Sequence, residues 1–133
     1  MMATERLEYK FTQYQHALRR LKEAAERQND ADNFIADAAI QRFEFVLELA
    51  WKLLKCYLEE EGITNINTPV EVLKEAYVVG VISNGDRWLE MVKKRNLTSH
   101  TYDERTAVAI YEAIKSEYLP LLTVLSDTMS TKI

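Results

Sequence analysis

One short segment, Lys93 to Asp103, concentrates the side chains that could do chemistry. Three consecutive bases, Lys93, Lys94 and Arg95, precede a polar run that contains His100, one of only two histidines. An arginine offers a fixed charged fork for a phosphate, and a histidine can move a proton near neutral pH. Together they could cleave RNA without a metal, with His100 acting on the 2′-hydroxyl or the leaving oxygen and Arg95 holding the phosphorane charge.

The spacing of this pair sets a condition on that chemistry. Arg95 and His100 are five positions apart, which is about 140° around an ideal helix, so they cannot share one helical face. We expect them to converge only if the helix ends between them, near Thr98 and Ser99, or if two chains bring them together. The alternative is a basic helix end, where three cations interact favourably with the negative C-terminal end of the helix dipole and His100 belongs to the following loop.

Glu48 is the second residue of interest, because it lies between Leu47 and Leu49 in the most apolar part of the chain. One interpretation is an ordinary ion pair with Lys52, four residues on, along an exposed strip of helix. The other is a carboxylate that anchors a partner or orients Arg95. The sequence alone leaves both open.

Composition restricts the fold that carries these residues. The chain has 133 residues, three glycines and two prolines. Average usage would give roughly 16 of these two turn-forming residues, so a sandwich, a barrel or a Rossmann unit is disfavoured. We predict one all-α domain over residues 1–133, with no metal and no cofactor, because a Gly-rich phosphate loop and a helical His–acid pair are both missing.

Other features point to a cytoplasmic protein. No run of about 18 apolar residues is present, and the segment Met1 to Lys10 lacks the apolar core of a signal peptide. The single cysteine, Cys56, excludes an internal disulfide and favours inert packing in a helix. A net charge of −4 disfavours a protein that depends on non-specific contacts to nucleic acid.

Apolar residues recur at helical spacing through most of the chain, which predicts an antiparallel up-and-down four-helix bundle with one helix broken into short segments. Thr68, Pro69 and Glu71 form a strong helix start, and Pro120 should kink the last helix. The expected elements are a helix from about Glu5 to Gln28 capped by Thr4, one from about Phe34 to Glu61 stopped by Gly62, two short helices beginning at Pro69 and after Asp86, and a long one from Asp103.

The second of these helices is apolar around most of its circumference between Phe43 and Leu54. A helix with more than one apolar face is buried on more than one face. In a chain this small we expect the second face to meet another chain, so the girdle from Phe43 to Leu54 predicts a homodimer.

Three stretches of the sequence carry a resemblance to a known family. The run FEFVLELAWKLLK from Phe43, continuing to Gly62, resembles the second helix of the nucleotidyltransferase substrate-binding proteins. The stretch from Pro69 to Met91 and the run RNLTSHTYDE from Arg95 continue it in order. The resemblance extends from about Leu7 to Leu125 and places the chain in the wider HEPN superfamily of helical bundles.

This resemblance implies a dimeric bundle whose gene lies beside that of a minimal nucleotidyltransferase. The neighbouring protein supplies the catalytic carboxylates and binds the nucleotide, and the helical subunit pairs with it. We therefore predict a substrate- or partner-binding subunit. Its candidate partner- or substrate-binding residues are Glu48, Trp51, Lys52, Lys93 and Lys94.

The superfamily also contains metal-independent ribonucleases with an Arg-polar-x3-His motif, including the related HepT-type toxins. Arg95, Asn96 and His100 match that motif position by position. In the toxin members, a tyrosine two residues beyond the histidine accepts AMP from the partner enzyme, and Tyr102 matches it. The alternative prediction is thus a ribonuclease toxin, with RNA as its substrate and the partner as antitoxin. A second alternative is a purely structural dimeric scaffold.

Overall fold

The structure, a computed structural model, describes residues 4–100 and 103–133, without the side chains of Ser99 and His100. Within these ranges all regular secondary structure is helical, which confirms the predicted all-α class. The elements are α1 (Glu5–Ala25), α2 (Phe34–Glu60), α3 (Pro69–Val78), α4 (Gly85–His100), α5 (Glu104–Ala113), a π-helical turn η1 (Ile114–Tyr118) and α6 (Leu119–Ser130).

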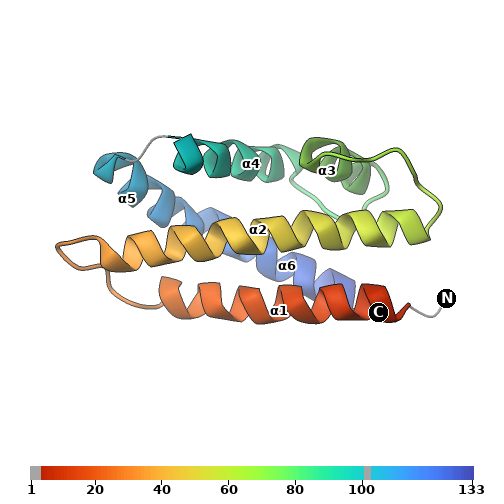
Figure 1. Cartoon of the computed structure of the whole chain (residues 1–133), viewed down its shortest axis with the longest axis horizontal. Coiled ribbons are helices and arrows are strands. Elements are labelled where there is room, and N and C mark those ends of the chain that lie inside the picture. The colour runs from red at the N-terminus through yellow and green to blue at the C-terminus, as the bar shows by residue number, and fades with distance from the viewer. Residues whose placement is uncertain (1–3, 101–102) are drawn as a thin grey trace.

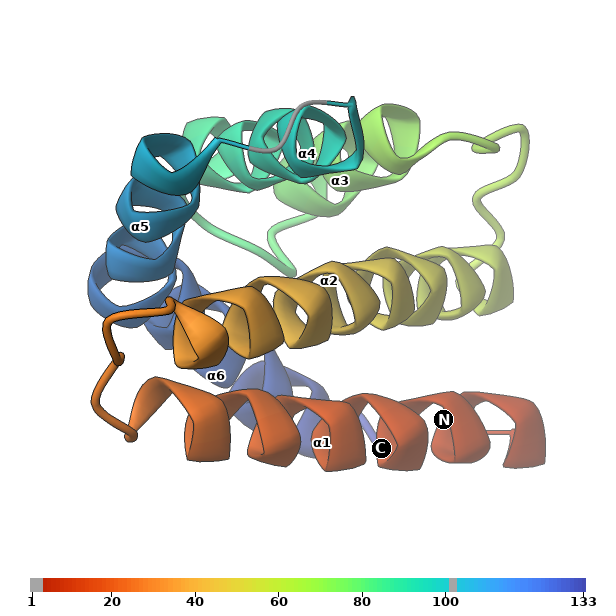
Figure 2. The same cartoon turned by 60° about the vertical axis from the view of Figure 1, so that its left-hand side comes forward.

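The long helix α2 lies in the middle of the bundle (Figure 1). On one side α3 and α4 follow each other in one layer, and on the other side α1 runs antiparallel to α2 (Figures 1 and 2). The α5–η1–α6 arm starts beside the beginning of α2 and continues along α1. The arrangement agrees with the predicted four-helix bundle, in which α3 and α4 together form the interrupted helix.

Side-chain caps fix the helix starts that the sequence predicts. The Thr4 hydroxyl accepts a hydrogen bond from the Leu7 amide at 3.1 Å. The Thr68 hydroxyl accepts one from the Glu71 amide at 3.2 Å, so α3 begins at Pro69. Each bond satisfies an amide that has no partner within its own helix. At the other end of α2, Gly62 adopts a φ of +91°, a conformation that favours glycine and ends the helix.

The last helix contains the predicted irregularity at Pro120. A proline cannot donate a backbone hydrogen bond within a continuous helix. The turn just before it, Ile114–Tyr118, is π-helical, and α6 then begins with Pro120 in its first turn. The long C-terminal arm is therefore divided into α5 and α6 without a loop between them.

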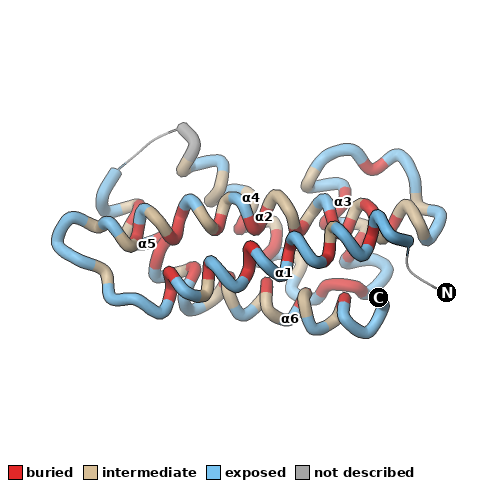
Figure 3. Tube along the Cα trace, turned by 60° about the horizontal axis from the view of Figure 1, so that its bottom comes forward, coloured by how far each residue is buried: buried red, intermediate tan, exposed pale blue. Residues whose placement is uncertain are grey.

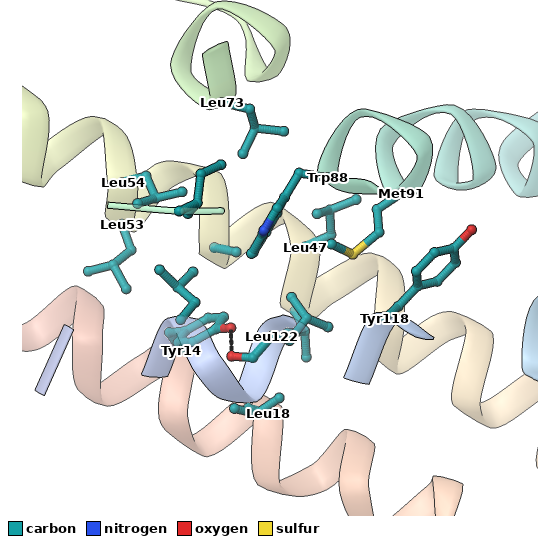
Figure 4. Packing of buried hydrophobic residues seen from close by; sticks show 14 of the residues in the cluster. Tyr14, Leu18, Leu47, Leu53, Leu54, Leu73, Trp88, Met91, Tyr118 and Leu122 are labelled. Atoms are coloured by element: carbon teal, nitrogen blue, oxygen red, sulfur yellow. Dashed lines mark hydrogen bonds between the residues drawn. The ribbon is translucent and has the colours of Figure 1, made fainter. Parts of the chain in front are cut away.

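The chain's own helices cover most of the apolar girdle of α2. Phe43, Leu47 and Leu53 are buried. The ring of Phe43 stacks on Tyr118, and Leu47 lies beside Trp88 of α4 (Figure 4). The α3–α4 layer thus takes the face for which the sequence suggested a second chain. The girdle's exposed large residue is Phe45, at 60%. The homodimer stays a prediction, and the width of the girdle no longer supports it.

Burial follows the same layering along the chain. Buried positions recur on the inward side of each helix, and most loop residues are exposed (Figure 3), although Ile66, Val81 and Ile82 of the loops are buried in the core. Among the described residues, no helix is both long and apolar enough to cross a bilayer.

Candidate functional site

Arg95 lies on α4, on the side that packs against α2. A small pocket of about 140 Å³ lies between the two helices there, and Pro69 at the start of α3 is part of its lining. Its lining residues are Leu47, Glu48, Trp51, Pro69, Val92, Arg95 and Asn96. The structure therefore brings together two of the predicted motif residues, Arg95 and Asn96, with two of the predicted binding residues, Glu48 and Trp51.

Glu48 is the electrostatic centre of this pocket. Its carboxylate accepts a hydrogen bond from Trp51 Nε1 at 3.0 Å and lies 3.1 Å from Lys52 Nζ. Partial burial acts to raise the pKa of Glu48, but the Trp51 hydrogen bond and the charges of Lys52 and Arg95 outweigh it and hold the pKa below its ordinary value. Glu48 thus forms the expected pair with Lys52 and also interacts with Arg95.

The cations predicted around the site differ in position. Lys52 extends past the indole of Trp51, with its Nζ 6.0 Å from the ring centroid. Lys93 is exposed and Lys94 is half-buried, and neither lines the pocket. Arg95 is therefore the cation of the three-base run that faces the pocket.

Beyond Arg95 the structure corrects one expectation. The helix does not end near Thr98 and Ser99, since α4 continues to His100. No glycine or proline interrupts the segment, and the Thr98 hydroxyl lies 2.7 Å from the Arg95 carbonyl and 2.8 Å from Glu44 Oε1. These neighbours hold the last turns of α4 against α2. Of the two routes by which Arg95 and His100 could converge, only a second chain is left.

The remaining motif residues cannot be placed in the same way. The side chain of His100 and the whole of Tyr102 lie outside the described residues. Their catalytic and modification roles stay predictions.

Glu44 is a site neighbour that sequence reasoning missed. It lies one helical turn before Glu48, and its carboxylate is within hydrogen-bond distance of the Thr98 hydroxyl. The signal was present, because acids four residues apart share one face of a helix. That face of α2 presents two carboxylates to α4.

The chemistry available at the site is anion recognition by Arg95 beside an aromatic ring. The guanidinium can hold a phosphate in two-point contact, and the Trp51 ring offers a surface on which a base can stack. Among the described residues, no three His, Cys, Asp or Glu side chains are grouped closely enough to hold a metal ion.

The cysteine is not part of any such site. Cys56 is buried, and burial together with Glu60 raises the pKa of its thiol to about 11. The thiolate is the nucleophilic form of cysteine, and it is scarce at neutral pH. The predicted packing role for Cys56 is confirmed.

Two solved structures share this fold. A protein from Thermus thermophilus superposes with a TM-score of 0.73 and 37% identity, over 90% of this chain and 97% of that one. A Haemophilus influenzae protein superposes with a TM-score of 0.68 and 27% identity, over 93% and 96% of the two chains. Its structure is described as revealing the fold of a substrate binding domain of a nucleotidyltransferase.

Sequence comparison agrees with the structural likeness. A "Probable ribonuclease HepT" from Haemophilus influenzae is 39% identical over an 87-residue match that covers 62% of this chain. The match spans 59% of that relative's length. Residues 9–131 match the family described as "Nucleotidyltransferase substrate binding protein like". Since that match takes in α2, the Arg95 pocket and the C-terminal arm, the chain belongs to the nucleotidyltransferase substrate-binding protein family.

Proposed function

We propose that this chain is the helical subunit of a two-protein nucleotidyltransferase system, and that it binds the substrate and the catalytic partner through the Arg95 pocket. The observation that carries the proposal is the placement of Arg95 beside Glu48 and Trp51 between α2 and α4. Family membership supports it, because the family and the Haemophilus influenzae structure are both described as substrate binding for a nucleotidyltransferase.

The pocket suits binding because its charge is already positioned. Glu48 restrains the guanidinium of Arg95, so less side-chain entropy is lost when a phosphate or a partner carboxylate arrives. A minimal nucleotidyltransferase, encoded by a neighbouring gene, would supply the metal-binding carboxylates and the nucleotide. This chain would contribute Arg95 and Trp51, together with the exposed Lys52 beside the indole ring.

The test is complex formation with that nucleotidyltransferase, followed by isothermal titration calorimetry. Arg95→Ala should raise the dissociation constant of the complex at least about tenfold, because truncating one member of a charge pair at an interface leaves the other member without its partner. Arg105→Ala removes an equal charge from an exposed position on α5 and should leave the affinity unchanged. Equal losses for both variants, or no complex with an active partner, would refute the proposal.

A second candidate function is a metal-independent ribonuclease that uses Arg95, Asn96 and His100. The name of the Haemophilus relative favours it. Since α4 is continuous through both motif positions, the reaction would need two chains, with Arg95 of one approaching His100 of the other. Leu97, which is 48% exposed and lies three residues before His100 on α4, offers an apolar contact for such a homodimer.

In this second candidate the partner would act as antitoxin by modifying Tyr102. The phenol oxygen would attack the α-phosphate of ATP, forming an O–P bond, while pyrophosphate leaves and the phenol proton passes to solvent. The added charge would compete with an RNA phosphate for Arg95. Mass spectrometry after incubation with the partner, ATP and magnesium should find one AMP, absent from Tyr102→Phe. An active partner that leaves every tyrosine unmodified would rule this regulation out.

A further inference from the structure

A second cavity lies on the opposite side of α2 from the α3–α4 layer, where α1 runs antiparallel beside it (Figure 2). This groove has a volume of about 610 Å³, in the range of pockets that hold a nucleotide-sized ligand. One stripe of each helix lines it, at spacings of three and four residues. The polar and aromatic members are Gln13, His16 and Arg20 from α1 and Gln41, Arg42 and Phe45 from α2.

The charge of this α1–α2 groove is opposite to that of the whole protein. Its lining contains two arginines, a histidine and no acid, whereas the chain carries a net charge of −4. Arg42 Nη1 donates a hydrogen bond of 2.7 Å to the backbone carbonyl of Arg20. A carbonyl is neutral, so this bond fixes the guanidinium without compensating its charge. Neither arginine forms an ion pair with a described residue.

Phe45 adds an aromatic surface at the edge of this positive groove. It is 60% exposed, although it belongs to the otherwise buried girdle of α2. Exposed rings beside cations are typical of sites for single-stranded nucleic acid, where a base stacks on the ring and the cations contact the backbone. Gln13 and Gln41 are exposed amides that can donate to and accept from a base edge.

We propose that the α1–α2 groove binds single-stranded RNA, with phosphates on Arg20 and Arg42 and one unpaired base stacked on Phe45. Inside a duplex the faces of each base are covered by the neighbouring base pairs, so duplex RNA should bind more weakly. The proposal goes beyond the proposed function, because the groove shares no residue with the Arg95 pocket. Binding there requires neither the partner protein nor RNA cleavage.

Fluorescence anisotropy of a labelled 2′-O-methyl RNA 12-mer, with the full chain, tests this inference. The 2′-O-methyl groups prevent cleavage through a 2′-hydroxyl. A lower anisotropy therefore reports weaker binding and not RNA cleavage. Arg20→Ala and Arg42→Ala should each weaken binding about three- to tenfold. Each should also reduce the dependence of log K on log salt by about 0.7, the contribution of one phosphate contact in a single strand. Arg20 is exposed, so its variant carries the test even if Arg42→Ala does not fold.

Stacking of a base on Phe45 is tested separately, with a Phe45 variant, a control variant at another exposed ring and a comparison with duplex RNA. Phe45→Ala should weaken binding at least about fivefold, as measured for bases stacked on aromatic side chains. Phe34→Ala removes an exposed ring at the start of α2, outside the groove, and should have no effect. The matching duplex should bind several-fold more weakly than the single strand and should not respond to Phe45→Ala.

Arg19→Ala controls for general electrostatics, since Arg19 neighbours Arg20 on α1 but does not line the groove. Equal effects of Arg19→Ala and Arg20→Ala would overturn the proposal, as would the absence of single-strand binding at low salt. It would also be overturned if Phe45→Ala halved the mass by light scattering while Arg20→Ala left RNA affinity unchanged. That result would assign the Phe45 face to an interface between two copies.

Discussion

The two sides of α2 hold arginines in different electrostatic states. On the α4 side, Arg95 interacts with the carboxylate of Glu48, which also binds Lys52 and Trp51. On the α1 side, Arg42 is held by a backbone carbonyl, and no acid lines the groove. Both guanidiniums are positioned by neighbours, but only the first is matched by an opposite charge.

Because of this difference, one side of α2 is suited to orienting a bound anion and the other side to binding an anion tightly. An anion that binds Arg95 must compete with Glu48, so the site gains orientation at some cost in binding strength. An anion that binds at Arg42 and Arg20 meets uncompensated charge, so the groove can supply affinity without a defined reaction geometry. One helix therefore presents a site suited to specific recognition or catalysis and a site suited to holding a strand.

The largest effect is expected on the rate of RNA cleavage, which should depend on the α4 side of α2 and not on the α1 side. If the chain is a ribonuclease, it should cut RNA in EDTA and leave a 2′,3′-cyclic phosphate. Arg95→Ala and His100→Ala should each lower the rate at saturating RNA by at least about a hundredfold, since each removes transition-state charge stabilisation or proton transfer. Gel analysis of end-labelled RNA measures the rate.

The groove variant Arg20→Ala is the matched comparison. It should raise the RNA concentration needed for half-maximal rate and leave the saturated rate unchanged, because uniform binding affects KM alone. A large fall in the saturated rate would place Arg20 in the chemistry and remove the distinction between the two sides. No cutting of any RNA by the wild-type chain would leave the binding-subunit proposal as the better one.

A smaller effect concerns assembly on the α4 side. If two chains combine their Arg95 and His100 positions, Leu97 should lie at the contact, since it is exposed and lies three residues before His100 on α4. Leu97→Glu should raise the dimer dissociation constant at least about tenfold by burying a charge at an apolar contact. Val124→Glu, at an exposed position of α6, is the control. A wild-type monomer at micromolar concentration, by light scattering, would contradict the prediction.

Much of the fold could be predicted because its determinants are local. Thr4, Thr68 and Gly62 mark helix ends through contacts within a few residues, and each end lies where expected to within one residue. The end of α1 was wrong by three residues, at Ala25 instead of Gln28. That last turn has weak signals, because no glycine or proline stops it.

The site was harder to predict, because it depends on which elements pack together. The position of Arg95 opposite Glu48 requires the α3–α4 layer to cover α2, and nothing local specifies that pairing. The same layer covers most of the apolar girdle, so the width of the girdle is no longer an argument for a second chain, and the homodimer stays a prediction. The α1–α2 groove was missed although its stripes, His16 to Arg20 and Gln41 to Phe45, are visible at helical spacing in the sequence.

Two buried tyrosines should show a further difference between the two sides (Figure 4). Tyr14 of α1 donates a 2.6 Å hydrogen bond to the Leu122 carbonyl, which joins α1 to α6. Tyr118, on the α4 side, has a buried hydroxyl with no hydrogen-bond partner of acceptable geometry among the described residues. Tyr14→Phe should lower the free energy of unfolding by about 1–2 kcal/mol, and Tyr118→Phe by less than about 0.5 kcal/mol. Urea unfolding measures both, and equal losses would contradict the assignment.

The smallest effect belongs to Glu48→Gln, which keeps the acceptor for Trp51 and removes the charge. Because Glu48 is 43% exposed, its loss should cost less than about 1 kcal/mol of stability at pH 7. The folded-state pKa of Glu48 is lowered, so its contribution is present above the unfolded value of about 4.3 and is lost as the pH falls through the folded pKa. The difference between wild type and variant in urea should therefore shrink between pH 7 and pH 3. A difference that stays constant would mean that the charge of Glu48 does not stabilise the Arg95 side of α2.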